Sequence, residues 1–275
     1  MLWGSATVPH SKQRNTLTTI IAGINGSIGS IIAKEEAKKG PVVGTYRKYD
    51  DHAKELAKNN NIELIQQDML ENSNMSAVVN SARALGTVNK IYYLIGESWN
   101  IGWDKVSLKD IDNAIKMCSL PVASLIIELK AELLDETNLM RWASVSGVSS
   151  LVFSGGPNKP ATGGAKHMAE FYFKSASAFY TWKQNLFNNV VLGFSNRTKN
   201  FHVGYNGDVL KNLCAKDIPI GTGTEPENVA NILMWLNADN NKFMTGQNIV
   251  VDGGETIKTR DNAKDTPMKD HPTYY

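Results

Sequence analysis

Residues 17–29 read LTTIIAGINGSIG. The apolar part, residues 17–22, predicts a buried strand, and residues 27–39 predict the helix that follows it. Between them, Gly23, Gly26 and Gly29 let the backbone turn tightly and approach a ligand closely. A strand, a glycine turn and a helix in this order predict a site where the free N–H groups and the positive dipole end of the helix receive a pyrophosphate.

Two interpretations of this glycine turn stay open. In the first, the turn holds a dinucleotide, and the contacting residues are Gly23, Asn25, Ser27, Ile28 and Gly29. In the second, the turn is a glycine-rich connection with no ligand. A glycine triplet alone is unspecific, but its position at the start of a strand–helix–strand unit favours the first interpretation.

The rest of the chain alternates between short apolar segments and longer amphipathic ones. The expected strands are residues 42–46, 62–66, 90–95, 139–145, 150–153, 189–194 and 248–252. The expected helices are a charged one that ends at Lys58, then residues 73–85, 108–136 with a soft break at Pro121, 161–184 and 226–236. The alternation predicts an α/β fold: a Rossmann-type, doubly wound parallel sheet with helices on both faces, in three layers.

Length and composition indicate one soluble domain. The chain has 275 residues, and we expect a flexible leader over residues 1–16, a single domain over 17–257 and a polar tail over 258–275. Because 29 Lys and Arg balance 27 Asp and Glu, nothing electrostatic favours nucleic acid or an anionic membrane as a partner. No apolar run reaches the roughly 20 residues of a membrane span. Cys118 and Cys214 lack metal-ligand spacing, so we expect reduced thiols and a cytoplasmic protein.

The end of the second expected strand bears on the choice of cofactor. An NAD site usually has an acidic residue there, which binds the ribose hydroxyls. Here Arg47 and Lys48 stand near that position. A planar guanidinium suits the oxygens of a 2′-phosphate, so Arg47 favours NADP(H) over NAD(H). The alternative is that both cations form a solvated strand end.

The far end of the chain carries the most specific motif. EPENVA at residues 225–230 leads through Trp235 and Leu236 to MTGQNIVVDGG at 244–254. This resembles the classical short-chain dehydrogenase/reductase family, and the glycine loop, Asp68, Met69 and Gly96 fall in that family's order over residues 17–257. The resemblance implies that Asp68 contacts the adenine amino group, that Met69 lines the adenine pocket and that the glycine loop surrounds the pyrophosphate.

The chain departs from the family pattern in its loops. The family has a glycine where this chain has Ser27, and this chain offers Gly26 instead. Of the family's Asn-Asn-Ala-Gly after the fourth strand, only Gly96 remains. The usual Pro-Gly after the sixth strand is replaced by residues 194–198, FSNRT, which weakens the expected nicotinamide contact.

The catalytic group departs further. The family reduces a carbonyl with an Asn-Ser-Tyr-Lys set, and Lys166 occupies the lysine place, where it also holds the nicotinamide ribose. Four residues earlier stands Thr162 instead of the tyrosine, and an aliphatic hydroxyl is a far weaker acid than a phenol. Ser119 occupies the asparagine place. For the serine we favour Ser144; Ser146, Ser154 and a plain turn serine are the alternatives.

The missing tyrosine has three explanations. Another group donates the proton, the candidates being Tyr172, Tyr205, His202, Glu97 and an ordered water. The enzyme runs a different cofactor-assisted step. Or catalysis is lost. The resemblance therefore implies either an NADP(H)-dependent oxidoreductase for a small carbonyl, alcohol or imine, or a degenerate dinucleotide-binding protein with a regulatory or scaffold role.

Aromatic residues suggest the character of the substrate pocket. The substrate loop spans about residues 198–224, and we expect a partly aromatic, mostly apolar pocket for a small molecule. Its candidate lining is Trp99, Trp103, Phe201, His202, Tyr205 and Leu213. The alternative is that these residues pack loops or a subunit contact. Family members are commonly dimers or tetramers built on the two long helices, and the second helix offers Met168, Phe171, Tyr172 and Phe179.

Overall fold

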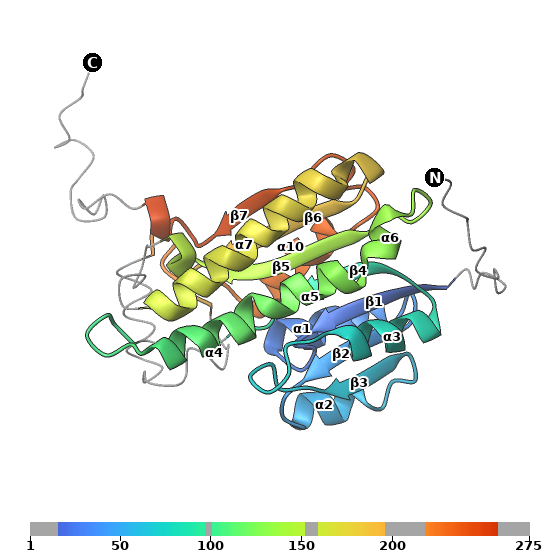
Figure 1. Cartoon of the computed structure of the whole chain (residues 1–275), viewed down its shortest axis with the longest axis horizontal. Helices are drawn as coiled ribbons and strands as arrows, with labels where there is room; N and C mark the ends of the chain where they lie inside the picture. Colours follow the sequence, from blue (N-terminus) through green and yellow to red (C-terminus); the bar gives the residue numbers. More distant parts are fainter. Residues whose placement is uncertain (1–15, 97–100, 152–158, 196–217, 258–275) are drawn as a thin grey trace, which may run out of the picture.

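The computed structural model describes residues 16–96, 101–151, 159–195 and 218–257. Seven strands form one parallel sheet in the order β3-β2-β1-β4-β5-β6-β7 (Figure 1). The strands are β1 (Leu17–Ala22), β2 (Val42–Tyr46), β3 (Ile62–Gln66), β4 (Thr87–Tyr93), β5 (Arg141–Gly147), β6 (Leu186–Leu192) and β7 (Gln247–Val251). This confirms the doubly wound α/β fold.

Helices cover both faces of the sheet. One face carries α3 (Ser76–Leu85), α4 (Leu108–Cys118), α5 (Leu120–Glu128), α6 (Lys130–Leu134) and α7 (Pro160–Tyr180). The other carries α1 (Ser27–Glu36) and α10 (Pro226–Leu236), with α2 (Asp51–Leu56) beside α1. Short 3-10 turns are η1 (Val148–Leu151), η3 (Thr181–Lys183) and η4 (Glu255–Ile257). Among the described helices, none is long and apolar enough to cross a membrane.

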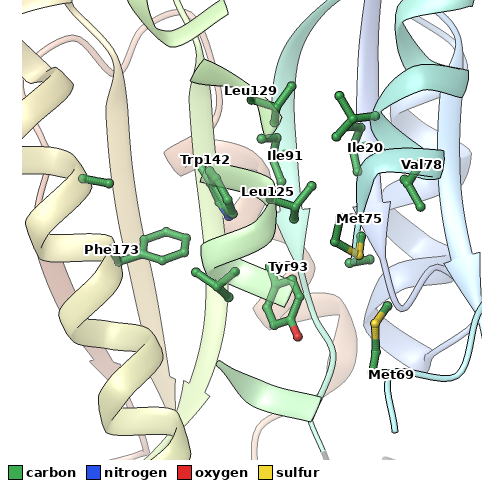
Figure 2. Packing of buried hydrophobic residues seen from close by; sticks show 14 of the residues in the cluster. Ile20, Met69, Met75, Val78, Ile91, Tyr93, Leu125, Leu129, Trp142 and Phe173 are labelled. Atoms are coloured by element: carbon green, nitrogen blue, oxygen red, sulfur yellow. The ribbon is translucent and has the colours of Figure 1, made fainter. Parts of the chain in front are cut away.

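Each face of the sheet has its own hydrophobic core. Between the sheet and the layer of α3, α5 and α7, Trp142 packs edge-on against Phe173, with ring centroids 5.0 Å apart, and close to Leu125 (Figure 2). On the opposite face, Ile21 and Ile32 belong to the cluster beneath α1 and α10. Burying a large apolar side chain contributes about 1.5–3 kcal/mol. Because helices cover both faces of the sheet, successive residues of β1 and β2 are buried alike.

Several expected elements have other bounds in the structure, and one expected strand is not a strand. The strand expected at 150–153 is wrong: residues 148–151 form the 3-10 turn η1, and 152–153 lie outside the described residues. There the Ser150 hydroxyl donates to the Glu170 carboxylate on α7, so this segment turns toward the helix instead of pairing in the sheet. The long helix expected over 108–136 is three helices. The first break, at Ser119, lies just before Pro121, which has no backbone N–H to continue the hydrogen bonds of α4. The second break is at Leu129. Both β4 and β6 begin three residues and end two residues earlier than expected.

The strand order fixes where a ligand can bind. From β1 the chain proceeds outward to β2 and β3, then crosses back so that β4 pairs with the other side of β1. In open α/β sheets, the carboxyl ends of the strands beside such a reversal form the ligand-binding crevice. The loops after β1 and β4 are therefore the place to look for a site.

Candidate functional site

A cavity of about 510 Å³ lies at the carboxyl ends of the strands. Its walls come from the loops that follow β1, β2, β3, β4, β5 and β6, together with Met117, Lys159 and Lys166. Of the ten cofactor residues expected from the sequence, all line this cavity: Gly23, Asn25, Ser27, Ile28, Gly29, Arg47, Asp68, Met69, Gly96 and Lys166.

The glycine loop is tightly folded between β1 and α1. Gly23 has a φ of +86°, a conformation that favours glycine, and its N–H donates to the Thr45 carbonyl oxygen at 3.2 Å. A Cβ on Gly29 would lie 2.3 Å from the Gly23 carbonyl oxygen, so α1 packs against the loop only because residue 29 has no side chain. The loop is therefore shaped by its glycines, as the sequence predicts.

The start of α1 faces the cavity without a side-chain cap. Its N-cap residue is Gly26, no side chain hydrogen bonds to the N-terminal amides as a cap, and the first turn contains no acidic residue. The first amides of a helix have no intrahelical acceptor and carry partial positive charge. This end of α1 therefore offers N–H donors to an anionic group in the cavity.

The loop after β1 is tied to the loop after β2. The Asn25 side-chain amide donates to the Lys48 carbonyl oxygen at 3.0 Å, and the His52 ring nitrogen Nδ1 lies 3.1 Å from the Asn25 carbonyl oxygen. Asn25 thus has a structural contact besides its place in the cavity wall. These bonds hold Arg47, which is exposed, beside the glycine loop.

The end of the cavity at β2 and β3 has the chemistry of an adenine site. Asp68 is half-buried, and its carboxylate accepts the Leu70 N–H at 3.0 Å, which orients it. Met69 is buried next to it. Asp50 also lines this end, where its carboxylate caps α2 by accepting the Ala53 N–H at 3.0 Å.

Lys166 occupies the opposite end, where two glycines leave room for it. A Cβ on Gly96 would lie 3.5 Å from Lys166 Nζ, and a Cβ on Gly147 would lie 3.3 Å from it. The ammonium thus stands between the ends of β4 and β5. Gly96 was expected at the site from the sequence, whereas the place of Gly147 beside the Lys166 ammonium was not.

Three of the four expected catalytic residues do not line the cavity. The Ser144 hydroxyl donates to Asn189 Oδ1 at 2.6 Å and borders a separate small cavity behind Lys166. The Ser119 hydroxyl donates to the Ala165 carbonyl oxygen at 2.6 Å, and Thr162 is buried. Ser154, the rival serine, lies outside the described residues. Of the four, only Lys166 reaches the cavity, and the roles of the other three stay predictions.

Two other serines, at the end of β5 and just after it, do line the cavity. Ser146 donates its hydroxyl to the Glu170 carboxylate. Ser149, which sequence reasoning missed, has its hydroxyl oxygen 3.8 Å from the place of a Cβ on Gly147, and the Lys166 ammonium lies 3.3 Å from the same point. Its sequence position could have identified it, because Ser149 lies two residues after the end of β5. Functional side chains commonly lie at the carboxyl ends of parallel strands.

Glu170 is a second residue that sequence reasoning missed. It is 3% exposed and lies one helical turn after Lys166 on α7. Its carboxylate accepts from the hydroxyls of Ser146 and Ser150, and from the Asn248 amide of β7 at 3.0 Å. A buried carboxylate is stable when several donors satisfy it. This network joins the end of β5 to α7 and β7 behind the cavity wall.

Of the remaining candidates for a proton donor, the structure describes only Tyr172, which does not line the cavity. Tyr172 is half-buried and packs against the core. Glu97, His202 and Tyr205 lie outside the described residues. Of the residues expected to line the substrate pocket, Trp99, Phe201 and Leu213 also lie outside the described residues, and Trp103 is 72% exposed. The described residues contain no group of three His, Cys, Asp or Glu side chains suited to a metal ion.

Comparison with known proteins matches this geometry. A family model described as enoyl-(acyl carrier protein) reductase covers residues 23–256, from the first loop glycine to η4. The chain belongs to the short-chain dehydrogenase/reductase family. Within this family, the 3-oxoacyl-[acyl-carrier-protein] reductase FabG of Chlamydia trachomatis is 25% identical over 238 residues, which cover 85% of each chain.

Solved structures share the fold of this short-chain dehydrogenase/reductase chain. ElxO with NADP bound superposes with a TM-score of 0.77 at 21% identity, over 88% of this chain and 100% of ElxO. A 4-hydroxyisoleucine dehydrogenase complexed with NADH also gives 0.77, at 19% identity, over 88% of this chain and 99% of its own. The fold thus occurs with either nicotinamide cofactor.

Proposed function

We propose that this protein is an NADP(H)-dependent oxidoreductase that acts on a small carbonyl compound or the corresponding alcohol. The observation that carries the proposal is that the uncapped start of α1 and the Lys166 ammonium open into one cavity. An oxidoreductase of this family needs both groups, one for the cofactor's diphosphate and one for its nicotinamide end.

The residues present fit a nicotinamide dinucleotide. Gly29 leaves the backbone close enough to receive a diphosphate, Asp68 and Met69 suit the adenine, and Gly96 leaves space beside Lys166. Arg47 supports NADP(H), since it is a cation at the end of β2 and lines the cavity. Asp50, the acidic residue nearby, is engaged as the cap of α2 and so is less suited to binding the ribose hydroxyls.

Arg47→Ala tests the cofactor choice. Charge-assisted hydrogen bonds contribute about 1.5–3 kcal/mol, so we expect NADPH affinity to fall roughly 10- to 100-fold and NADH affinity to change little. Nicotinamide fluorescence titration measures both, and Lys109→Ala, which removes an exposed cation on α4, controls for net charge. Equal losses for the two cofactors would contradict the NADP(H) preference.

The reaction requires a hydride and a proton. Reduced nicotinamide supplies the hydride to the carbonyl carbon when bound. The protein must supply a proton to the oxygen, and the buried Thr162 is too weak an acid for that. Lys166 would orient the cofactor, and its positive charge would stabilise negative charge that develops on the oxygen.

Thr162→Tyr tests whether a lost phenol is the only defect. If the site otherwise works, the variant should raise the rate of carbonyl reduction, because a positioned acid contributes typically 10²–10⁴-fold. Thr162→Phe is the matched control, since it adds the same ring without the hydroxyl. Retained NADPH binding with equal rates for the two variants would argue against simple loss of the donor.

A second candidate is a degenerate dinucleotide-binding protein with a regulatory or scaffold role. It is favoured by one observation: the Ser119, Ser144 and Thr162 side chains all lie outside the cavity wall. NADPH binding without turnover on a broad panel of ketones, aldehydes and imines would support this candidate over the oxidoreductase.

A further inference from the structure

Two lysine side chains, Lys159 and Lys166, line the same cavity and interact electrostatically. Lys159 is the N-cap residue of α7, and Lys166 lies seven residues further along, inside the helix. Both line the cavity, together with Ser149 of η1 and Gly193 after β6. The family resemblance gives a role to Lys166 alone.

The two ammonium groups repel each other. Within the described part of the chain, neither makes a hydrogen bond or an ion pair shorter than 4 Å. Burial and then the charge of Lys166 lower the pKa of Lys159, while the carboxylate of Glu255 acts in the opposite direction. Glu255 is buried behind Gly193 and does not line the cavity. Of these charged groups, only the two ammonium groups line the described cavity wall.

The cofactor's own negative charges lie elsewhere. Its diphosphate would lie at the start of α1 after β1, and a 2′-phosphate at Arg47 after β2. The end of β5 is two strand positions from β1 and three from β2, which is about 10 and 14 Å. The nicotinamide ring that would reach this end is neutral or positively charged. A negatively charged group on the other reactant would relieve the repulsion.

We propose that Lys159, with Lys166 beside it, binds an oxyanion group of the substrate, a carboxylate or a phosphate, next to the reacting carbonyl. This inference rests on the proposed function and narrows its substrate class to anionic carbonyl compounds. The sequence predicts a mostly apolar substrate pocket. The proposed oxyanion site adds two cationic side chains, Lys159 and Lys166, to that pocket.

The test uses two unreactive probes of equal size, oxamate and its neutral counterpart oxamide. Each is titrated by calorimetry into the full chain saturated with NADPH. We expect oxamate to bind at least 10-fold more tightly than oxamide. Lys159→Met should remove this difference, Lys159→Arg should keep most of it, and Lys174→Met, an exposed lysine on α7, should leave it unchanged. Thermal unfolding of each variant checks that it is folded.

The outcomes separate this inference from the proposed function. Equal binding of the two probes, or an unchanged ratio in folded Lys159→Met, would overturn the oxyanion site. Methyl phosphate in a second arm identifies the group: tighter binding than oxamate indicates a phosphate, and weaker binding indicates a carboxylate. If NADPH does not bind, the proposed function fails, but the same oxamate titration of the cofactor-free protein still decides whether the lysines form an anion site.

Discussion

At the scale of single residues, the glycine loop makes the sharpest prediction. Gly29→Ala would place a methyl group 2.3 Å from the Gly23 carbonyl oxygen and 2.9 Å from that of Ile24, and both contacts are backbone. Because α1 must shift to relieve them, we expect a loss of about 1–3 kcal/mol of stability and weaker NADPH binding. Urea unfolding and fluorescence titration measure the two effects.

Gly164→Ala is the matched control for Gly29→Ala. Gly164 is exposed inside α7, and a Cβ there meets nothing within 4 Å. Alanine is a better helix former than glycine, so this variant should gain about 0.5–1 kcal/mol and bind NADPH normally. Similar stabilities for the two variants would mean that the tight loop contact is wrong.

All ten residues expected to bind the cofactor line the cavity, but of the four expected catalytic residues only Lys166 does. The glycines follow from backbone constraints that are visible in the sequence, whereas Asp68 follows from the family resemblance. Whether a serine hydroxyl points into a cavity depends on tertiary contacts, and Ser144 is drawn away by Asn189. Lys159 and Ser149 carry no motif, so only the folded chain brings them beside Lys166.

At the scale of elements, the start of α4 links stability to pH. Ser107 and Asp110 form a reciprocal capping box, and the Ser107 hydroxyl and then its backbone N–H lower the pKa of Asp110. This stabilising contribution is complete above the carboxyl's unfolded pKa and is lost as the pH falls through its lower folded pKa.

Ser107→Ala removes this box. We expect a loss of about 0.5–2 kcal/mol at neutral pH and a higher pKa for Asp110. Urea unfolding and an NMR titration of the carboxyls measure them. Asp135, whose pKa is lowered by the Thr137 hydroxyl and then its N–H, serves as an internal reference that should not move. An unchanged Asp110 pKa would contradict the capping geometry.

Element boundaries followed from the sequence where local signals agree. β1, β2, β3 and α10 have the expected bounds, because apolar runs end at glycine, proline or charged residues. The conformation of residues 150–153 was predicted wrongly, because a short apolar run is compatible with either a strand or a 3-10 turn. Its conformation depends on Glu170, which lies 20 residues further along the chain.

At the scale of the whole molecule, α7 leaves large apolar side chains exposed. Phe171 is 65% exposed and Phe179 is 64% exposed, with Trp182 of η3 at 66%. Exposed apolar patches of this kind often mark contacts between proteins. Since α4 and α7 pack side by side (Figure 1), we propose that they form the interface of a homodimer or homotetramer.

Sedimentation analysis tests this assembly. The wild-type chain should sediment as a dimer or tetramer at micromolar concentration, and Phe171→Glu should shift it toward monomer, because a charge in a buried apolar contact is unfavourable. Lys174→Glu, an exposed position on the same helix, controls for the added negative charge. A monomeric wild-type chain would rule the interface out.

The central claim is that a dinucleotide binds across the carboxyl ends of this sheet. Its most direct test is a crystal structure grown with excess NADPH. The account predicts a diphosphate against the first amides of α1, within the loop from Gly23 to Gly29, and a nicotinamide beside Lys166. A loop that is blocked, or that contains no dinucleotide at saturating NADPH, would contradict it.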